Sequence, residues 1–169
     1  MDFPIRKPNR IPDFDYSTPG AYFLTICISD RKCILGKIVG GGDLDAPQMV
    51  LSHIGRVVQQ NIEVSRQIPN IRVDKYVIMP NHVHLILFVD ACGSGGTSRS
   101  PSPTNATVPR YVSCLKRFCH HALHSVIFQK SYHDHVIRNE ADYLKIWNYI
   151  DTNPARWEKD CFYEQEDAR

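Results

Sequence analysis

The chain has 169 residues, of which 43% are hydrophobic and 22% charged, and this balance excludes a wholly disordered protein. The length suits one domain with its own core, so we expect a single domain over residues 1–169. The formal net charge is only +2, which excludes a protein that holds nucleic acid by bulk charge; any such binding must come from local patches.

The start of the chain does not have the pattern of a targeting segment. Residues 1–7 are charged and are interrupted by Pro4, without an apolar core. No stretch approaches the ~20 apolar residues that a membrane span needs. Among the six cysteines, Cys27 lies inside an apolar run, where it would pack as a small hydrophobic side chain. We therefore expect a cytoplasmic protein with reduced thiols and no membrane contact.

The first part of the chain predicts an irregular arm, a strand and a helix. Residues 1–19 are rich in Pro, Asp and Arg and form the arm. Residues 21–28 are β-branched and aromatic, which predicts a strand buried on both faces. Gly40 to Asp43 is a turn between two short strand-like pieces. Residues 50–68 predict a helix with one apolar stripe that includes Val58 and Ile62.

Two further strands and a loop occupy the middle of the chain. Residues 71–79 predict one strand, and residues 82–89, the most apolar segment, predict another after the break at Pro80-Asn81. The composition then changes sharply, because residues 91–107 are mainly Gly, Ser, Thr and Pro. That composition predicts a mobile loop within the domain.

The last part of the chain is mainly helical. Residues 109–126 show helical spacing through Val112, Leu115, Phe118 or Cys119, and Leu123, and residues 128–137 are extended or irregular. Residues 140–151 predict a helix that turns Leu144, Trp147 and Ile150 inward and is broken at Asn153-Pro154. A few strands alternating with helices predict an α+β fold with one antiparallel sheet and helices packed on one face.

His82 and His84 are the strongest chemical signal. Residues two apart on a strand point to the same face, so both imidazoles project together while Val83 and Leu85 point away. Two neutral imidazoles side by side form a natural bidentate metal site. The alternative is two strand histidines that make ordinary hydrogen bonds. The apolar strand favours the metal site, because an unpartnered imidazole is costly to bury.

Tyr149 lies on the last predicted helix, away from its expected inward stripe. Asn153 is four residues further on and shares its face. A tyrosine and an amide oxygen one turn apart can meet the same metal-bound phosphate, the first as nucleophile and the second as ligand. The alternative is a partly buried tyrosine, with Asn153 as a helix C-cap before Pro154.

Residues 133–140 contain two further histidines, an arginine and an asparagine. They could form a metal or acid–base cluster. We favour a loop that positions phosphate, with Arg138 as the contact and Asn139 as the cap of the next helix.

The helix predicted over residues 109–126 carries a modest basic face. Arg110, Lys116 and Arg117 could follow a DNA backbone, and Lys145 on the last helix is a further candidate contact; a solvated surface is the alternative. The same helix holds a group of cysteines and histidines: Cys114, Cys119, His120, His121 and His124. Their spacing lacks the paired pattern of closed structural zinc sites, so we do not expect one.

The assembled motifs resemble those of the REP-associated tyrosine transposases, a branch of the HUH single-tyrosine transposases. The matching segments are residues 15–17 and 20–26, 77–85 with Pro80-Asn81-His82-Val83-His84, 132–140, and 149–154. They occur in the family's order and span nearly the whole chain. The sequence departs from the family at Phe128, where Trp is frequent, and in the Gly- and Ser-rich stretch after Val89.

The resemblance implies a ferredoxin-like fold with the histidine pair on a central strand and the tyrosine on a helix that faces it. It implies that His82, His84 and Asn153 hold Mg²⁺ or Mn²⁺, and that Tyr149 is the nucleophile. The implied substrate is single-stranded DNA beside a hairpin, cleaved through a 5′-phosphotyrosine and rejoined by a monomer or homodimer. The alternatives are a non-catalytic module that binds single strands on a ferredoxin-like sheet, and a phosphodiesterase that uses metal-bound water.

Overall fold

The structure is a computed structural model that describes residues 14–40, 46–66, 68–91 and 106–163. Most of the predicted arm at 1–19, most of the glycine turn at 40–43 and most of the predicted loop at 91–107 therefore lie outside the described residues. Within those described ranges, every helix is too short or too polar to cross a membrane.

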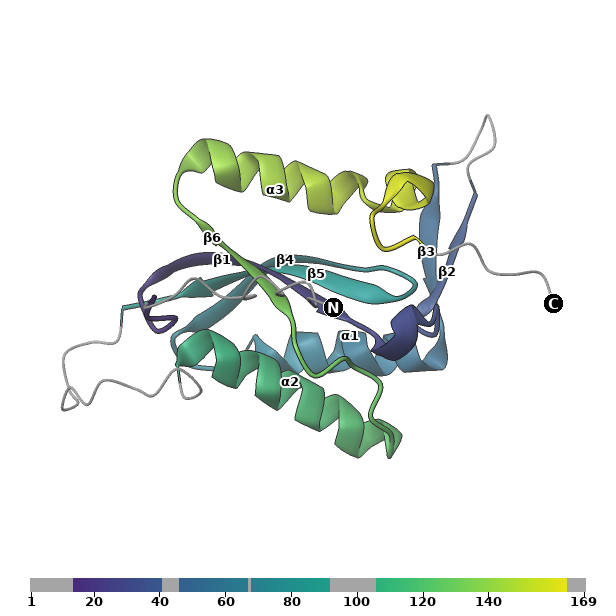
Figure 1. Ribbon diagram of the computed structural model, residues 1–169, viewed down its shortest axis with the longest axis horizontal. Coiled ribbons are helices and arrows are strands. Elements are labelled where there is room, and N and C mark those ends of the chain that lie inside the picture. The colour runs from purple at the N-terminus through teal and green to yellow at the C-terminus, as the bar shows by residue number, and fades with distance from the viewer. Residues whose placement is uncertain (1–13, 41–45, 67, 92–105, 164–169) are drawn as a thin grey trace, which may run out of the picture.

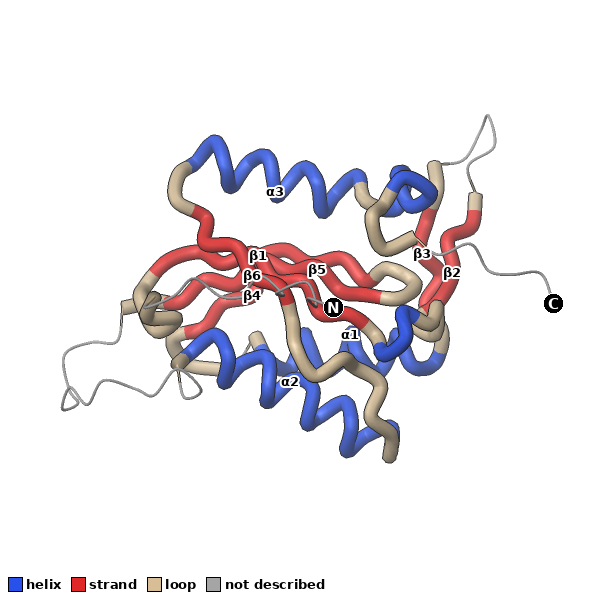
Figure 2. The backbone as a smooth tube through the Cα atoms, viewed as in Figure 1, coloured by secondary structure: helices blue, strands red, loops and turns tan. Residues whose placement is uncertain are grey.

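The described part contains six strands, three α-helices and two 3-10 helices (Figures 1 and 2). In chain order they are β1 (Gly20–Cys27), the 3-10 helix η1 (Ser29–Arg31), β2 (Gly36–Val39), β3 (Gln48–Leu51), α1 (His53–Ser65), β4 (Ile71–Ile78), β5 (His82–Val89), α2 (Thr107–Leu123), β6 (His133–Ile137), α3 (Glu140–Thr152) and the 3-10 helix η2 (Pro154–Lys159).

The main sheet has the strand order β4-β5-β1-β6, and each neighbouring pair is antiparallel. It follows that β1 and β4 run parallel with β5 between them, joined through α1. In the same way β5 and β6 run parallel with β1 between them, joined through α2. Two such split βαβ units make the ferredoxin-like topology. The predicted α+β class with an antiparallel sheet is therefore confirmed, and β2 and β3 form a separate hairpin between β1 and α1.

The helices cover both faces of this sheet (Figure 2). As expected, α1 and α2 share one face, where they pack on Leu85 and Leu87. The expectation that all helices lie on one face is corrected by α3, which packs on Ile86 from the opposite side. The physical reason is the apolar character of β5, which places aliphatic side chains on both faces and so needs cover on both.

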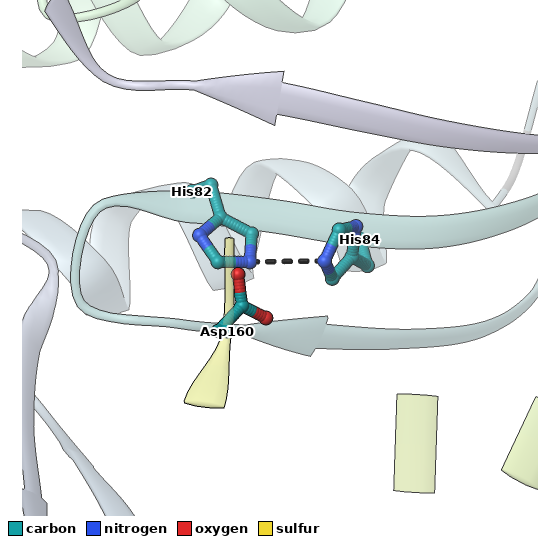
Figure 3. Close-up of side chains that lie close together, drawn as sticks. All are labelled: His82, His84 and Asp160. Atoms are coloured by element: carbon teal, nitrogen blue, oxygen red, sulfur yellow. Dashed lines mark hydrogen bonds between the residues drawn. The ribbon is translucent and has the colours of Figure 1, made fainter. Parts of the chain in front are cut away.

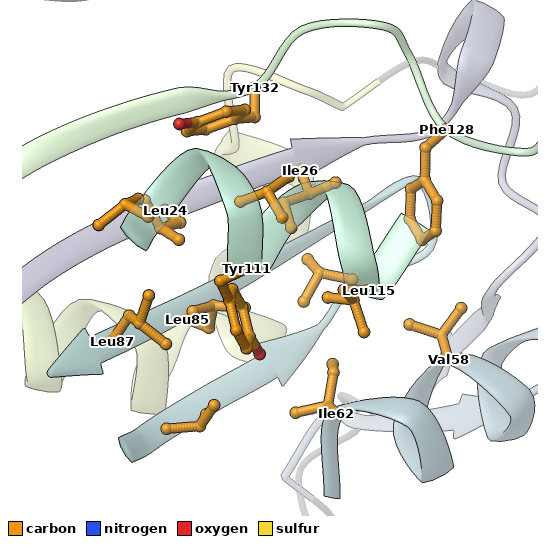
Figure 4. Packing of buried hydrophobic residues seen from close by; sticks show 14 of the residues in the cluster. Leu24, Ile26, Val58, Ile62, Leu85, Leu87, Tyr111, Leu115, Phe128 and Tyr132 are labelled. Atoms are coloured by element: carbon orange, nitrogen blue, oxygen red, sulfur yellow. The ribbon is translucent and has the colours of Figure 1, made fainter. Parts of the chain in front are cut away.

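The larger core lies between the sheet and the helices α1 and α2 (Figure 4). Tyr111 and Leu115 of α2 meet Val58 and Ile62 of α1 beneath β5, and all four side chains are buried. Of the two residues that the helical spacing allowed inward, Cys119 is buried and Phe118 is 53% exposed. Cys27 is buried as expected of a small apolar side chain.

Some predicted boundaries shift because strands compete with helices for the same residues. The helix predicted over 50–68 begins only at His53, since Gln48–Leu51 pairs with β2. Ser52 caps α1, and its Oγ accepts a hydrogen bond from the Gly55 amide at 3.0 Å. Within the segment predicted as extended or irregular, His133–Ile137 pairs with β1 and becomes the edge strand β6.

The inward face of α3 agrees with the predicted one at Ile150 and differs from it at Leu144 and Trp147. Leu144 is 55% exposed and Trp147 is 40% exposed, whereas Ile146 and Ile150 are buried. The helix carries apolar residues on two faces, so helical spacing alone does not identify the buried one. The observed face also brings Tyr149 toward the sheet, where it packs with the buried Ile146–Ile150 cluster.

Gly55 lies where α1 passes closest to the segment before β2. A Cβ at this position would overlap the backbone carbonyl of Leu35 and touch the Leu51 side chain at 3.1 Å. We expect Gly55→Ala to destabilise the protein by about 1–3 kcal/mol, because backbone must move to admit the methyl group. Gln60→Ala, on the exposed side of the same helix, should stay within about 0.5 kcal/mol. Urea unfolding measures both; equal midpoints for Gly55→Ala and wild type would contradict this packing.

Candidate metal and tyrosine site

The two histidines of β5 lie side by side on the face that α3 covers (Figure 3). His82 pairs with Cys27 and His84 with Thr25 of β1, so the pair sits on a central strand, at the end of the sheet beside the β4–β5 turn. Their Nε2 atoms are 2.9 Å apart, and the side chains are 0% and 1% exposed. The predicted two-residue period therefore holds, since Val83 and Leu85 belong to the core on the other face.

The outer nitrogens of both imidazoles are held by hydrogen bonds. His82 Nδ1 donates to Asn81 Oδ1 at 2.8 Å, and the Asn81 amide is fixed because its Nδ2 donates to the Phe162 carbonyl at 2.7 Å. His84 Nδ1 lies 2.8 Å from the Thr25 hydroxyl, which can donate or accept. With Nδ1 engaged in this way, each ring can present a bare Nε2 lone pair to a metal.

Burial keeps the pair neutral. It lowers the pKa of His82 to about 4, against the opposing pull of the Asp160 carboxylate. Burial also lowers the pKa of His84 well below its usual value, and the neighbouring His82 acts in the same direction. Neutral imidazole is the form that binds metal ions, so the electrostatics suit ligation at neutral pH.

Tyr149 and Asn153, at the end of α3, approach the site from the α3 side of the sheet; Tyr149 contacts His84, and Asn153 contacts Asp160. The Tyr149 hydroxyl is 3.2 Å from His84 Nε2. Asn153 is 2% exposed, and its Oδ1 is buried without a hydrogen-bond partner among the described residues. Buried polar atoms are normally satisfied, so this amide oxygen is a candidate ligand for a cation.

Asp160 is a site residue that the sequence did not reveal. Its Oδ2 accepts hydrogen bonds from the Tyr149 hydroxyl at 3.2 Å and from Asn153 Nδ2 at 3.1 Å. Ligand atoms of His82, His84 and Asp160 all lie within 4.8 Å of one another (Figure 3), which makes a possible metal-binding triad. The residue reaches the site because η2 folds the chain back after Asn153. The only sequence signal was Pro154, which marks the end of the helix.

The donor set fits a divalent metal. Two neutral imidazoles and the Asn153 amide oxygen are its neutral groups, and the Asp160 carboxylate, which already accepts hydrogen bonds from Tyr149 and Asn153, adds a negative charge beside them. The two nitrogens favour Mn²⁺ over Mg²⁺, because Mg²⁺ prefers oxygen ligands throughout. The mutual positions of Tyr149 and the histidines then place a hydroxyl next to the same cation site.

The Tyr149 hydroxyl is a weak acid in this environment. Burial raises its pKa to about 12, and the negative charge of Asp160 adds to the effect. At neutral pH the group is therefore a phenol, and a reaction at its oxygen needs an acceptor for the proton. The Asp160 carboxylate is the acceptor already in contact.

Aromatic side chains enclose the histidines. Phe23 stacks on His84 with ring centres 5.1 Å apart, and Phe162 lies 4.7 Å from the His82 ring. Trp157 is 6.0 Å from the same ring. Both histidines are almost completely buried, so a phosphate reaches them only if part of this enclosure moves.

The predicted DNA contacts lie at different places on the molecule. Arg138 is exposed between β6 and α3, where Asn139 caps α3 through a 2.9 Å hydrogen bond as predicted, and Lys145 is exposed on α3. Arg110, Lys116 and Arg117 lie on α2, which covers the sheet face opposite the histidine pair. Nearby, His135 Nε2 contacts Asp142 Oδ2 at 2.8 Å.

Lys116 is engaged within the protein. Its Nζ donates to the carbonyl oxygens of Gln129 at 2.7 Å and Ser131 at 2.9 Å, which ties α2 to the segment before β6. We expect Lys116→Met to lower the free energy of unfolding by about 1.5–3 kcal/mol, because these are hydrogen bonds from a charged group. Arg117→Met, next to it on the exposed side, should change it by less than about 0.5 kcal/mol. Urea unfolding separates the two; equal losses would contradict the assignment.

Comparisons with known proteins place these features in context. No family model matches the chain. An uncharacterized protein of Haemophilus influenzae is 32% identical over 173 residues, which cover 94% of this chain and 93% of the relative. The solved structure of a REP-associated tyrosine transposase bound to a REP hairpin aligns with a TM-score of 0.60 at 18% identity, over 89% of this chain and 74% of that one. A putative transposase from Deinococcus radiodurans aligns with a TM-score of 0.40 at 15% identity, over 85% of this chain and 97% of that one.

Proposed function

We propose that this chain, which belongs to one sequence family with the Haemophilus influenzae protein and has the fold of the REP-associated tyrosine transposases, is a transposase. In this proposal it depends on a metal ion, and it cleaves and rejoins single-stranded DNA. The observation that carries the proposal is the convergence of a tyrosine hydroxyl, two buried neutral histidines and an orphaned amide oxygen.

In this proposal Tyr149 is the nucleophile. Its oxygen attacks the scissile phosphorus, the bond to the 3′ oxygen breaks, and the departing strand keeps a free 3′-hydroxyl. The product is a 5′-phosphotyrosine, which conserves the energy of the phosphodiester bond. A second 3′-hydroxyl can then attack the phosphotyrosine and join two strands without ATP.

Asp160 has a positioning and proton-accepting role in the same step. Its Oδ2 already receives the Tyr149 hydroxyl hydrogen bond, so it can take the proton as the phenol oxygen attacks. Asp160 Oδ2 also accepts a hydrogen bond from Asn153 Nδ2, so the amide oxygen of Asn153 points away from the carboxylate.

His82, His84 and Asn153 are the proposed metal ligands. Mg²⁺ or Mn²⁺ held there would neutralise charge on the non-bridging oxygens of the scissile phosphate. Asn81 and Thr25 keep the imidazoles oriented through Nδ1, so the ligand geometry is set before substrate arrives.

The proposed substrate is single-stranded DNA beside a hairpin. The solved neighbour carries a REP hairpin, and the four exposed cations Arg138, Lys145, Arg110 and Arg117 could contact a DNA backbone. Local contacts of this kind suit a chain whose net charge is only +2. We keep Lys116 as a weaker candidate, because its ammonium group already has protein partners.

A covalent-adduct assay tests the proposal. The protein is incubated with Mn²⁺ and a labelled DNA hairpin that carries single-stranded extensions, and the mixture is separated under denaturing conditions. We expect label to stay with the protein. Cleavage without any adduct would instead indicate a hydrolase that uses metal-bound water, and binding without cleavage would indicate a non-catalytic module.

A further inference from the structure

A cavity of about 580 Å³ lies next to the site, between the β2–β3 hairpin and η2. This volume is within the range of small-molecule pockets, ~300–1,000 Å³. Figure 1 shows η2 and the hairpin beside each other at the end of the sheet where the β4–β5 turn lies. Pro80 from that turn and Pro154 after Asn153 both line the cavity. Two of its lining residues are therefore close in sequence to the candidate site: Pro80 comes two residues before His82, and Pro154 directly follows Asn153.

The lining of this cavity combines cations with aromatic rings. Lys37 comes from β2, and Arg156 and Lys159 come from η2. Among the residues that the structure describes, Glu158 is the one carboxylate of the lining. Positive side chains around a cavity of this size favour an anionic ligand. The exposed ends of the cations can contact phosphate while they remain hydrated.

Trp157 connects the cavity to the histidines. Its ring lines the cavity and is also 6.0 Å from the His82 ring. Tyr163 stands nearly perpendicular to it, with ring centres 5.3 Å apart and an interplanar angle of 82°. Two rings at a right angle give a planar group both a surface to stack on and an edge to rest against. A nucleobase is the planar group that is covalently linked to a phosphate.

We propose that the cavity between β2 and η2 binds one unpaired nucleotide of the DNA strand next to the scissile phosphate, with its base against Trp157 and Tyr163 and its phosphate near Lys37, Arg156 and Lys159. The assignment rests on the proposed function and deepens it, because it gives the site a means to fix the register of the strand. Stacking is tolerant of base identity, so the cavity positions a nucleotide more than it reads sequence.

Fluorescence tests the stacking directly. The chain has two tryptophans, so Trp147→Phe leaves Trp157 as the single reporter. The probe is a DNA hairpin with mixed-sequence single-stranded extensions. We expect the probe to quench Trp157 fluorescence as it binds. Unchanged fluorescence at saturating probe would overturn the proposal, and so would equal quenching by a free deoxynucleotide at the same concentration, which would make the cavity a mononucleotide site.

Binding measurements with an abasic probe identify the contact. We expect Trp157→Leu to weaken binding of the intact probe about five- to hundredfold. An abasic nucleotide is then moved through the extension, one position at a time. At one position, the abasic probe should bind the wild type as weakly as the intact probe binds Trp157→Leu. At that same position, Trp157→Leu should bind the abasic probe no more weakly than it binds the intact probe. Trp147→Leu on the outer side of α3 is the matched control and should bind as wild type does. If every abasic position lowered the affinity of Trp157→Leu by the same further factor, Trp157 would contact no particular base and its role would be structural.

Lys37→Gln provides a test that leaves the aromatic pair intact. Lys37 is exposed on β2, so the substitution does not disturb the core or the histidines. We expect weaker binding at low salt and a slope of affinity against salt that is smaller by about one phosphate contact. An unchanged slope would contradict the phosphate part of the proposal. These equilibrium measurements need no cleavage, so failure of the cavity proposal is distinguishable from failure of the covalent-adduct assay.

Discussion

Tyr149→Phe is expected to abolish covalent attachment to DNA and to lower strand cleavage by roughly three orders of magnitude or more, because it removes the oxygen that we propose forms the new bond. The substitution deletes one hydroxyl and leaves the ring, whose packing against Phe23 holds this end of α3 on the sheet. DNA binding and the free energy of unfolding should therefore stay close to those of the wild type. Adduct yield, cleavage rate and equilibrium binding are the three measurements.

Tyr143→Phe is the matched control on the same helix. Its hydroxyl donates to Asp74 Oδ2 at 2.6 Å, on the β4 side and away from the histidines. This variant should keep adduct formation while losing the same number of atoms. Equal loss of activity in the two variants would mean that the hydroxyl groups act through the fold. Cleavage that persists in Tyr149→Phe would indicate that water, and not Tyr149, is the nucleophile.

The second large effect is expected at the metal ligands. His82→Gln and His84→Gln should weaken Mn²⁺ binding at least about hundredfold, since even changes to the outer partners of ligands cost ~10–100-fold. Adduct formation should fall with metal affinity, and a chelator should stop it in the wild type. Glutamine preserves most of the buried volume, which limits the packing loss. Manganese binding is followed by electron paramagnetic resonance, and adduct yield on denaturing gels.

His133→Gln is the control for the metal prediction, because this histidine is exposed on β6. It should bind Mn²⁺ and form the adduct as the wild type does. If His82→Gln and His84→Gln retained full manganese affinity, the Nε2 atoms would not be the ligands and the buried pair would be structural. Full adduct formation in the presence of a chelator would contradict the metal dependence itself.

Local patterns were sufficient to predict the parts of the site that lie within one element. The two-residue period of a strand placed His82 and His84 on one face, and the four-residue spacing of a helix placed Asn153 with Tyr149. The antiparallel sheet followed from short apolar segments that alternate with helices. These features depend on neighbours in sequence, and the structure shows them as expected.

Features that depend on long-range packing could not be predicted in the same way. Asp160 reaches Tyr149 only because η2 reverses the chain. The residues around Asp160 in the sequence form no motif that predicts a functional role. The buried face of α3 was predicted correctly at Ile150 and wrongly at Leu144 and Trp147, which look as apolar as the buried Ile146. Lys116 looked like a surface cation, yet its stem is long enough to reach carbonyl groups across the α2–β6 loop.

In the proposed reaction, Tyr149 forms the bond to DNA beside a metal that the histidine pair would hold. Protease digestion of the wild-type adduct followed by tandem mass spectrometry identifies the residue and the DNA end that are joined. We expect that the modified peptide contains Tyr149 and that its phenol oxygen carries the 5′-phosphate of the downstream strand. A nucleotide attached to another residue, or through its 3′ end, would contradict it.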